Sequence, residues 1–332
     1  MRSRLLTLAL LPVVAVAALA VANVRDDSPR GWRGSPWLSP DARVPALAAP
    51  LTLRVVTFNI ADGYLFTTNR RERMQAIGAL LTDLDADVVG LQESFVAADR
   101  AVLLAALSGS RLRHHVRFPG AVVGNGLLIL SAFPIEEAWF HRFESDGSWY
   151  RLAEGDWWAG KGVGMARLRL PGGGLLDFYD THAIAGRGNP ANAWIRQGQM
   201  AELARFVRES RVPGAPAFVV GDFNTRPGAA DYELAVRHAR LQRAMTIASE
   251  IDHIFAVEDP ALDFRVVETR ELAGTTRGSG PAFFIARPPR PAELWSLFFG
   301  EPEDTALSDH PGYLSVVEVR PRRRGPPSPD VR

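Results

Sequence analysis

Short apolar segments with the length of buried strands alternate along this chain with segments of helical periodicity. Residues 53–58 are expected to form the first strand. A helix is expected over residues 70–84, where apolar residues recur every three or four positions and share one face (Met74, Ile77, Leu81 and Leu84). This alternation favours a layered α/β protein in which helices cover the faces of sheets.

The same pattern continues to the end of the chain. A second amphipathic helix is expected over residues 191–208, with Trp194, Met200, Leu203 and Val207 on its apolar face. No repeat of fixed period is present. Further strands are expected at residues 87–91, 126–130, 163–170, 175–181, 217–220, 251–256 and 313–319.

Residues 1–24 have the layout of an export signal, with two early arginines, a long uncharged run and an A-x-A cleavage candidate at residues 20–22. The apolar run of about 20 residues is also long enough to span a bilayer, although Pro12 makes it a mediocre span. We therefore expect an exported protein. It would be secreted or periplasmic if the leader is cleaved, and membrane-anchored if the leader stays. A buried helix is the third alternative.

Composition divides the rest of the chain into three parts. Residues 25–50 are rich in Pro, Asp, Arg and Ala and are expected to form an extended linker. Residues 51–320 hold all the expected strands and helices and are interpreted as one domain. Residues 321–332 are rich in Pro and Arg and are expected to be disordered.

Composition also excludes several classes of protein. The chain is 47% hydrophobic and 23% charged, which is typical of a globular protein. It has no cysteine, which excludes disulfides, thiolate metal sites and a cysteine nucleophile. Its 38 basic and 37 acidic residues give a net charge of +1, and removal of the two leader arginines would leave 36 against 37. Proteins that bind nucleic acid through its phosphates usually have a clear basic excess, so no nucleic-acid partner is expected.

Polar side chains follow four of the expected strands and precede the last one. A single strand end of this kind usually means only that the chain leaves the core for solvent. Five such ends are harder to explain in this way, because α/β proteins gather functional groups at the ends of buried strands. The five sets are Asn59, Gln92-Glu93, His182, Asp222 with Asn224, and Ser308-Asp309-His310.

This ordered set resembles the endonuclease/exonuclease/phosphatase superfamily, and the resemblance covers about residues 52–319. The combination of Gly-Asp-Phe-Asn at residues 221–224 with Ser-Asp-His at residues 308–310 is specific, whereas Leu-Gln-Glu alone would be weak. The resemblance implies a four-layer α-β-β-α sandwich with two packed mixed β-sheets. It also implies an active site at one end of the sandwich.

Residues 125–131 and 155–164 look like the corresponding segments of the neutral sphingomyelinase branch. In that branch a Lys-Gly segment precedes the strand that leads to the catalytic histidine, and an acidic residue lies five positions before the lysine. Asp156 and Lys161 reproduce this spacing, so the resemblance places both at the active site. Lys161 would otherwise be interpreted as a solvated loop cation, but it is the sole lysine of the chain.

The residue types predict metal-assisted hydrolysis. Mg²⁺ is usually held by one or two carboxylates, waters and substrate phosphate, so Glu93 is the expected protein ligand. Asn59 is expected beside it, holding a metal-bound water or a phosphate oxygen. Mn²⁺ or Co²⁺ could replace Mg²⁺. His310 is the expected general base, because an imidazole of ordinary pKa accepts a proton from water near neutral pH.

Other polar residues are expected to support this chemistry. The resemblance implies that Asp309 pairs with His310 and that Asp222 orients the attacking water. Asn224 and His182 are expected to donate hydrogen bonds to the phosphoryl oxygens as negative charge builds. Asp252, another feature of the family, is expected to support the site from behind, and its neighbour His253 to pack in the core or face solvent.

A second apolar stretch lies at residues 281–299, between two of the strands that carry site residues. Core strands would be its ordinary interpretation, but its three prolines at residues 288–291 argue against a continuous strand. We therefore expect Trp295, Phe298 and Phe299 to enter the lipid interface, as aromatic residues do.

Three interpretations of function remain at this point. The first is a sphingomyelinase-like phospholipid phosphodiesterase that acts at a membrane surface and releases a phosphorylated headgroup. The second is a nuclease or phosphoinositide phosphatase of the same superfamily. The third is a non-catalytic lipid-binding relative, which the full catalytic set disfavours because binding alone needs no general base. No protein partner is evident.

Overall fold

The computed structural model describes residues 47, 49–63, 69–118, 120, 124–147, 159–186, 189–272, 275–277 and 304–322. The helices of this part of the chain are α2 (Arg70–Asp83), α3 (Ala97–Ala106), α5 (Pro190–Ser210) and α6 (Ala230–Ala239). The strands are β1 (Leu51–Asp62), β2 (Val88–Ser94), β3 (His114–Arg117), β4 (Leu128–Ser131), β5 (Ile135–Arg142), β6 (Gly162–Arg169), β7 (Leu175–His182), β8 (Ala217–Asp222), β9 (Leu241–Arg243), β10 (Asp252–Val257), β11 (Leu262–Leu272), β12 (Thr275–Arg277), β13 (Asp304–Ala306) and β14 (Gly312–Pro321).

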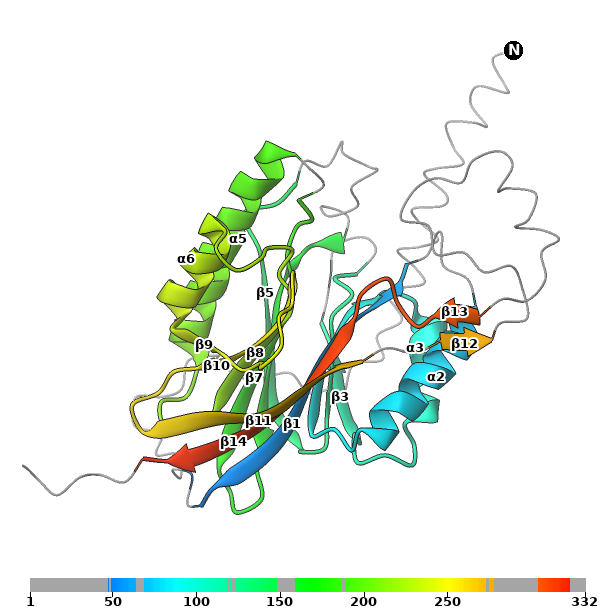
Figure 1. The fold of residues 1–332 in the computed structure, drawn as a ribbon, viewed down its shortest axis with the longest axis horizontal. Helices are drawn as coiled ribbons and strands as arrows, with labels where there is room; N and C mark the ends of the chain where they lie inside the picture. Colours follow the sequence, from blue (N-terminus) through cyan, green and yellow to red (C-terminus); the bar gives the residue numbers. More distant parts are fainter. Residues whose placement is uncertain are drawn as a thin grey trace, which may run out of the picture.

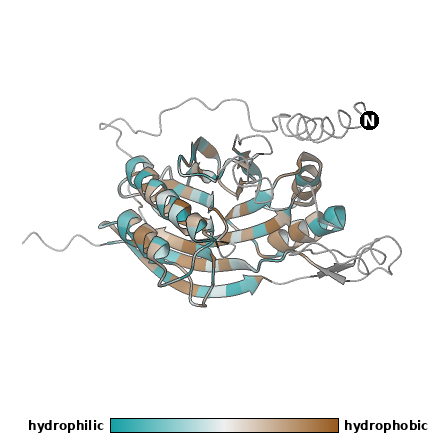
Figure 2. Ribbon diagram, turned by 90° about the horizontal axis from the view of Figure 1, so that it is seen from above, coloured by the Kyte–Doolittle hydropathy of each residue, from teal (hydrophilic) through white to brown (hydrophobic). Residues whose placement is uncertain are grey.

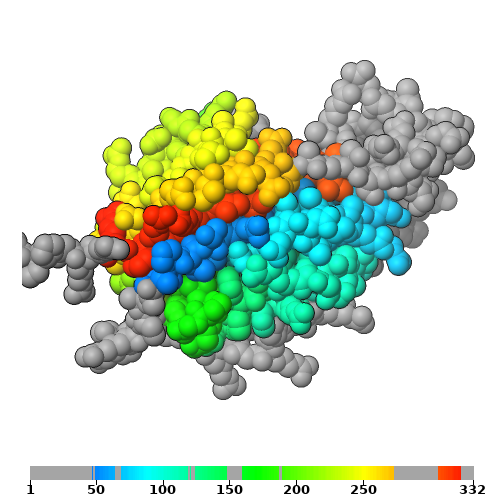
Figure 3. Space-filling model, turned by 60° about the horizontal axis from the view of Figure 1, so that its bottom comes forward, coloured from blue at the N-terminus to red at the C-terminus, as the bar shows by residue number. Residues whose placement is uncertain are grey.

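Two six-stranded mixed sheets form the centre of the molecule (Figure 1). The first has the order β11-β14-β1-β2-β4-β3, and its β1 and β2 run parallel. The second has the order β5-β6-β7-β8-β10-β9, and its β7 and β8 run parallel. The C-terminal strand β14 (red) lies on the surface between β1 (blue) and β11 (orange), so the two ends of the domain pair in one sheet (Figure 3).

Three apolar clusters separate four layers. One cluster packs α2 and α3 against the first sheet, and another packs α5 and α6 against the second sheet. The third lies between the two sheets. In Figure 2 the apolar residues of the helices face the sheets and their polar residues face outward. The prediction of a four-layer α-β-β-α sandwich with two packed mixed sheets is therefore confirmed.

Strict alternation along the strands explains where the polar residues lie. In β1, Leu53 and Val55 pack between the sheets, whereas Val56 and Phe58 pack under the helices. Successive side chains of a strand point to opposite faces, so Asn59 continues the face of Leu53 and Val55. By the same rule, Asp180 and His182 of β7 lie on the same face as Phe178. Val220 and Asp222 of β8 lie on the same face as Phe218. The space between the sheets is thus apolar along most of its length and polar at one end.

The predicted helix over residues 191–208 is present, but its expected apolar face is wrong at one position. Met200, Leu203 and Val207 are buried, whereas Trp194 is 76% exposed. Met200 lies six positions after Trp194, and six steps of about 100° give about 600° of rotation on an α-helix. This is about 120° short of two full turns, so the two side chains lie about 120° apart. The buried face near Trp194 is formed by Asn192 and Arg196 instead.

Other differences concern elements that lack a strong local pattern. The sequence reasoning did not identify α3, α6, β3, β5, β9 or β11 to β13. It also placed Pro321 in a disordered tail, but Pro321 ends β14 and the guanidinium of Arg322 donates to Asp263 at 2.6 Å. Most of the proposed leader, linker and tail lies outside the described residues. None of the helices in the part of the chain that the structure describes is long and apolar enough to cross a bilayer.

Candidate active site

Pairing between neighbouring strands brings the polar strand ends together. Asn59 of β1 lies opposite Gln92 of β2. In the second sheet, Asp222 of β8 lies opposite His182 of β7 on one side and opposite Asp252 of β10 on the other. Each of these residues is at or near the end of its strand, so they form two short polar rows that face each other across the sandwich.

Asn59 joins the two rows. Its side-chain nitrogen Nδ2 donates to Glu93 Oε1 and to Asp222 Oδ2, at 3.1 Å in each case. Its Oδ1 accepts a hydrogen bond from the backbone N–H of Ala61 at 3.1 Å, which fixes the orientation of the amide. Asn59 acts here as a donor that holds two carboxylates in place. Its Oδ1 has a second lone pair, and its expected contact with a metal-bound water or phosphate oxygen stays a prediction.

Glu93 is the carboxylate with access to solvent. Its side chain is 30% exposed, whereas those of Asp222 and Asp252 are 2% exposed. The backbone of Glu93 has φ +59°, a left-handed conformation that is uncommon for a residue other than glycine. This turn falls at the residue where the alternation of β2 would otherwise direct the side chain under the helices. With this turn, the carboxylate of Glu93 lies at the site, where it accepts a hydrogen bond from Asn59.

These features fit Mg²⁺ at Glu93. The ion keeps several water ligands, so its protein ligand must be reachable from solvent, and it prefers carboxylate oxygen. Asp222, Asp252 and His310 also place ligand atoms within 4.8 Å of one another. In that group, however, the imidazole lies between the two buried carboxylates and supplies the opposing charge. Among the residues that the structure describes, Glu93 is therefore the side chain best suited to hold such a cation.

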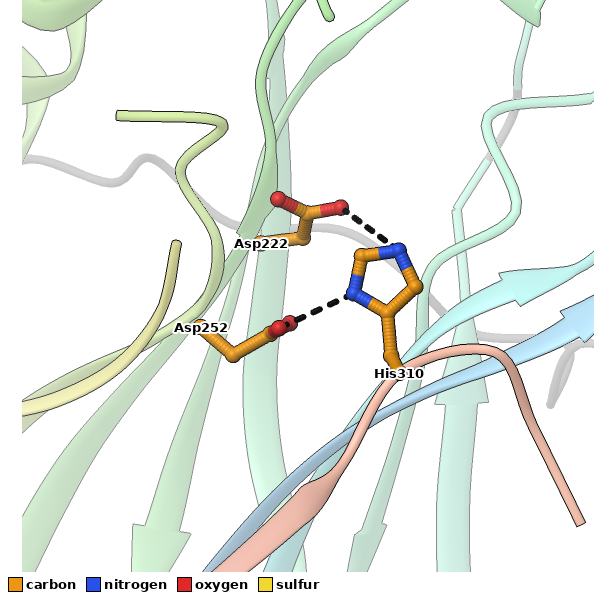
Figure 4. A group of neighbouring side chains, drawn as sticks. All are labelled: Asp222, Asp252 and His310. Atoms are coloured by element: carbon orange, nitrogen blue, oxygen red, sulfur yellow. Dashed lines mark hydrogen bonds and ion pairs between the residues drawn. The ribbon is translucent and has the colours of Figure 1, made fainter. Parts of the chain in front are cut away.

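Asp252 holds the imidazole of His310. The Nδ1 of His310 lies 2.9 Å from Asp252 Oδ2, and its Nε2 lies 3.9 Å from Asp222 Oδ2 (Figure 4). With Nδ1 bound to a carboxylate, Nε2 is the nitrogen available to exchange a proton with a substrate. Asp252 was expected only to support the site from behind, and the structure places it in direct contact with His310.

The expected pairing of Asp309 with His310 is wrong. Asp309 is exposed, and its Oδ1 lies 3.4 Å from the hydroxyl of Ser308. The two residues lie in a bend before β14, where the histidine is partly buried and the aspartate is exposed. Asp309 acts on His310 only through its charge.

Charge interactions set the protonation of this pair. Burial alone would lower the pKa of His310, but the hydrogen bond and charge of Asp252, with the charges of Asp222 and Asp309, raise it to about 9. Burial and the charge of Asp252 raise the pKa of Asp222 to about 7, although His310 and Lys161 oppose this rise. Two buried carboxylates therefore share the positive charge of one imidazolium.

Lys161 and His182 lie beside the same carboxylates. Lys161 is buried, and it is close enough to Asp222 to lower its pKa through charge. The Nε2 of His182 is 3.3 Å from Asp222 Oδ2 and 3.9 Å from Glu93 Oε1. Asn224 has φ +51°, and its side-chain nitrogen donates to the carbonyl of Ala183 at 3.0 Å, which ties it to the segment after His182.

Most of the residues expected at the site thus meet there: Asn59, Glu93, Lys161, His182, Asp222, Asn224, Asp252 and His310. Asp156, Trp295, Phe298 and Phe299 lie outside the described residues. His253 packs in the core, with its ring 5.1 Å from that of Tyr232. Sequence reasoning missed the direct bond between Asp252 and His310. The register of β10 against β8 places Asp252 at the site and so indicates this bond, but the register is known only from the folded sheet.

Comparisons with known proteins agree with this geometry. A family model described as the Endonuclease/Exonuclease/phosphatase family matches residues 56–310. A putative neutral sphingomyelinase from Drosophila melanogaster is 32% identical over 193 residues, covering 58% of this chain and 43% of the fly protein. An inositol phosphosphingolipids phospholipase C from Schizosaccharomyces pombe is 29% identical over 235 residues, covering 68% of this chain and 53% of the yeast protein. The chain therefore spans about half the length of the curated relatives it matches.

A solved structure shares the fold. A variant of beta toxin from Staphylococcus aureus, crystallised with bound magnesium ions, matches with a TM-score of 0.59. The match covers 80% of this chain and 99% of the toxin at 17% sequence identity. At this identity the likeness supports the sandwich fold alone.

Proposed function

Because the chain belongs to the Endonuclease/Exonuclease/phosphatase family, we propose that it is a Mg²⁺-dependent phosphodiesterase that acts on phosphosphingolipids. The observation that carries this proposal is the contact network at the strand ends. Asn59 donates to the solvent-accessible carboxylate of Glu93 and to Asp222, and Asp222 lies 3.9 Å from the imidazole of His310, which Asp252 holds by Nδ1. The curated relatives that are named for this class of lipid support the choice of substrate.

The chain's own residues suffice to describe the proton transfer. The unprotonated Nε2 of His310 accepts a proton from water as the water oxygen bonds to phosphorus. The bond from phosphorus to the oxygen of the lipid alcohol breaks, and this oxygen takes a proton from solvent, which leaves a phosphomonoester headgroup and the alcohol. His310 then returns its proton to solvent. Asp252 stabilises the imidazolium that forms. Asp222, 3.9 Å from Nε2, is placed to orient the attacking water.

Three side chains can stabilise the phosphoryl oxygens. Lys161 supplies a positive charge, and a ring nitrogen of His182 lies 3.3 Å from Asp222 Oδ2. The side-chain nitrogen of Asn224 gives one N–H to the carbonyl of Ala183 and carries a second N–H. Fixed donors of this kind lower the barrier because they need no reorganisation as charge develops. When bound at Glu93, Mg²⁺ would withdraw charge from the phosphate and assist the leaving oxygen. Mn²⁺ and Co²⁺ could fill the same place.

A substrate panel tests the proposal. The protein is incubated with sphingomyelin, lysophospholipid, phosphoinositide and plasmid DNA, each with Mg²⁺ or with EDTA. We expect a phosphorylated headgroup to be released from the sphingolipid in Mg²⁺ and its release to be lost in EDTA. Cleavage of DNA or release of inorganic phosphate from the phosphoinositide would instead favour the nuclease or the phosphatase. Lipid binding without turnover would identify a non-catalytic relative.

We also propose that the protein is exported and works at a membrane surface. The uncharged leader at residues 1–24 and the aromatic residues Trp295, Phe298 and Phe299 support this proposal. These segments lie outside the described residues, so the support is in the sequence alone.

Replacing Trp295, Phe298 and Phe299 together with serine should impair hydrolysis of bilayer lipid more than hydrolysis of a soluble phosphodiester. The reason is that aromatic side chains hold a protein at the interface but do not take part in the chemistry. Both rates are measured on the same preparation. Val267→Ser is the matched control, because Val267 is an exposed hydrophobic residue of β11. Equal loss of both activities in the triple variant would contradict membrane contact.

A further inference from the structure

A buried carboxyl group that the proposed mechanism does not use lies between the sheets beneath the site. Asp180 of β7 is fully buried, and its Oδ1 lies 2.6 Å from the side-chain nitrogen of Gln92 in β2. The same Gln92 nitrogen lies 3.3 Å from the hydroxyl of Thr57 in β1. The contact therefore crosses from the second sheet to the first.

The space for this contact is built into both sheets. A Cβ on Gly90 of β2 would lie 3.0 Å from the carboxyl carbon of Asp180, so the glycine makes room for the acid. The strands on either side of Asp180 place Gly164 of β6 and Val220 of β8 opposite it. No ionisable side chain among these residues faces Asp180, and the nearest one on its own face of β7 is His182. No ion pair of Asp180 occurs within the described part of the chain.

Two polar atoms of this pair have no partner if the acid is ionised. Asp180 Oδ2 and Gln92 Oε1 are both buried and without a hydrogen bond. Both are oxygens, so neither can donate to the other unless one carries a proton. A protonated Asp180 removes the conflict, because its O–H can donate to Gln92 Oε1 while Oδ1 accepts from Nε2. Burying one unpaired charge here would be far more costly than burying a neutral acid.

We propose that Asp180 is a neutral carboxylic acid paired with the Gln92 amide, and that this pair positions Glu93 and His182 by joining the two sheets beneath them. Gln92 immediately precedes Glu93, and Asp180 lies two residues before His182 on the same face of its strand. A shift of the pair therefore moves both residues. Burial, which raises the pKa of Asp180 well above its ordinary value, agrees with the neutral form.

Asp180→Asn provides the first test, because asparagine is isosteric and cannot ionise. Native Asp180 would keep its proton at pH values where the unfolded chain loses it, so this residue costs stability as pH rises above about 4. The unfolding midpoint of Asp180→Asn, relative to that of the unchanged protein, should therefore increase between pH 5 and pH 8 by about 2–4 °C or more. If the difference between the two unfolding midpoints stays constant or decreases with pH, Asp180 is not a neutral acid in the folded protein.

Infrared spectroscopy gives a second readout that does not depend on stability. At pH 8 the carbonyl band of protonated carboxylic acids should be weaker in Asp180→Asn than in the unchanged protein, because one such acid has been removed. If both proteins give the same spectrum in that region, Asp180 is ionised and the proposal fails.

The positioning role is tested by activity, and this arm rests on the proposed phosphodiesterase function. Asp180→Asn should keep kcat within about twofold, whereas Asp180→Leu should lower it by about 10²-fold with little change in KM, since small displacements of a site have effects of this size. Gln92→Glu should lower kcat, because two facing carboxyl groups do not reproduce the acid–amide pair. The double variant Asp180→Asn/Gln92→Glu exchanges the positions of the acid and the amide. It again has one of each and should recover most of kcat.

The outcomes separate the two proposals. If the sphingolipid is not hydrolysed by any of the proteins, the phosphodiesterase function fails while the infrared and unfolding results still decide the state of Asp180. If Asp180→Leu keeps full activity in a folded protein, the pair does not position the site.

Discussion

Replacing His310 with alanine is expected to lower kcat for the phosphodiester by about 10²–10⁴-fold, the range for loss of a general base. Substrate binding should change much less, because Lys161, His182 and the proposed metal ligand Glu93 are unaltered. The measurement is steady-state hydrolysis of sphingomyelin in mixed micelles with saturating Mg²⁺. His238→Ala is the matched control, because His238 is an exposed histidine of α6 and should leave kcat unchanged.

The pH dependence of the reaction should identify His310 as the group that titrates. Only the unprotonated imidazole can accept a proton, and Asp252 and its neighbours raise the pKa of His310 to about 9. The ratio kcat/KM should therefore increase as the pH rises toward about 9. A divalent cation at Glu93 would repel the imidazolium, so its binding should move the midpoint to lower pH.

Asp252→Asn should separate the two roles of the carboxylate. The variant removes the charge that keeps His310 protonated, so the midpoint of the profile should move to lower pH. The plateau should also fall, by about 10²-fold or more, because the imidazolium loses its partner and Nδ1 loses its acceptor. A profile with an unchanged midpoint in Asp252→Asn, or a plateau equal to that of the unchanged protein, would contradict the assignment.

Replacing Glu93 with glutamine is expected to have the second large effect. Glutamine keeps the shape but removes the charge of Glu93, whose side chain is more exposed than those of Asp222 and Asp252. Metal assistance contributes several kcal/mol, and each 1.4 kcal/mol is tenfold in rate, so kcat/KM should fall by about 10²–10³-fold. Binding of Mg²⁺ itself, measured by calorimetry without substrate, should weaken in parallel.

Glu209→Gln is the control for the loss of one negative charge, since Glu209 is an exposed residue of α5. It should bind Mg²⁺ and hydrolyse substrate as before. If Glu93→Gln binds Mg²⁺ with unchanged affinity, the cation is held elsewhere. The group formed by Asp222, Asp252 and His310 would then be the next place to test.

Much of the site could be predicted because its residues lie at the ends of strands with strong apolar patterns. Asn59, Glu93, His182 and Asp222 each follow a run of alternating or continuous apolar residues, so each could be placed at the end of a buried strand. The alternation of β2 would direct Glu93 under the helices, and the left-handed backbone that turns Glu93 is seen only in the structure. The partner of His310 could not be predicted in this way. Asp309 is its neighbour along the chain and Asp252 is 58 residues away, and only the pairing of β10 with β8 brings Asp252 to the imidazole.

The elements that were missed show the same limit. Strand β11 has charged residues at many positions and little apolar alternation, yet it pairs with β14 along nearly its whole length. The partner strand β14 determines the place of β11, because the backbone N–H and C=O groups of the two strands bond to each other. Trp194 was assigned to a buried face on its hydrophobicity alone, whereas the packing of Asn192 and Arg196 turns it toward solvent.

The sequence by itself indicated a layered α/β protein with polar residues at its strand ends, because strand periodicity is a local feature. Its motifs carried the resemblance that implied the family, the sandwich fold and the type of chemistry. The tertiary structure alone decided which carboxylate holds the imidazole, which one solvent can reach, and that Asn59 donates to both sheets. It also created the buried contact between Asp180 and Gln92. These are properties of distances and burial between segments far apart in the chain. They depend on the register of the strands and the packing of two sheets, and no local pattern encodes either one.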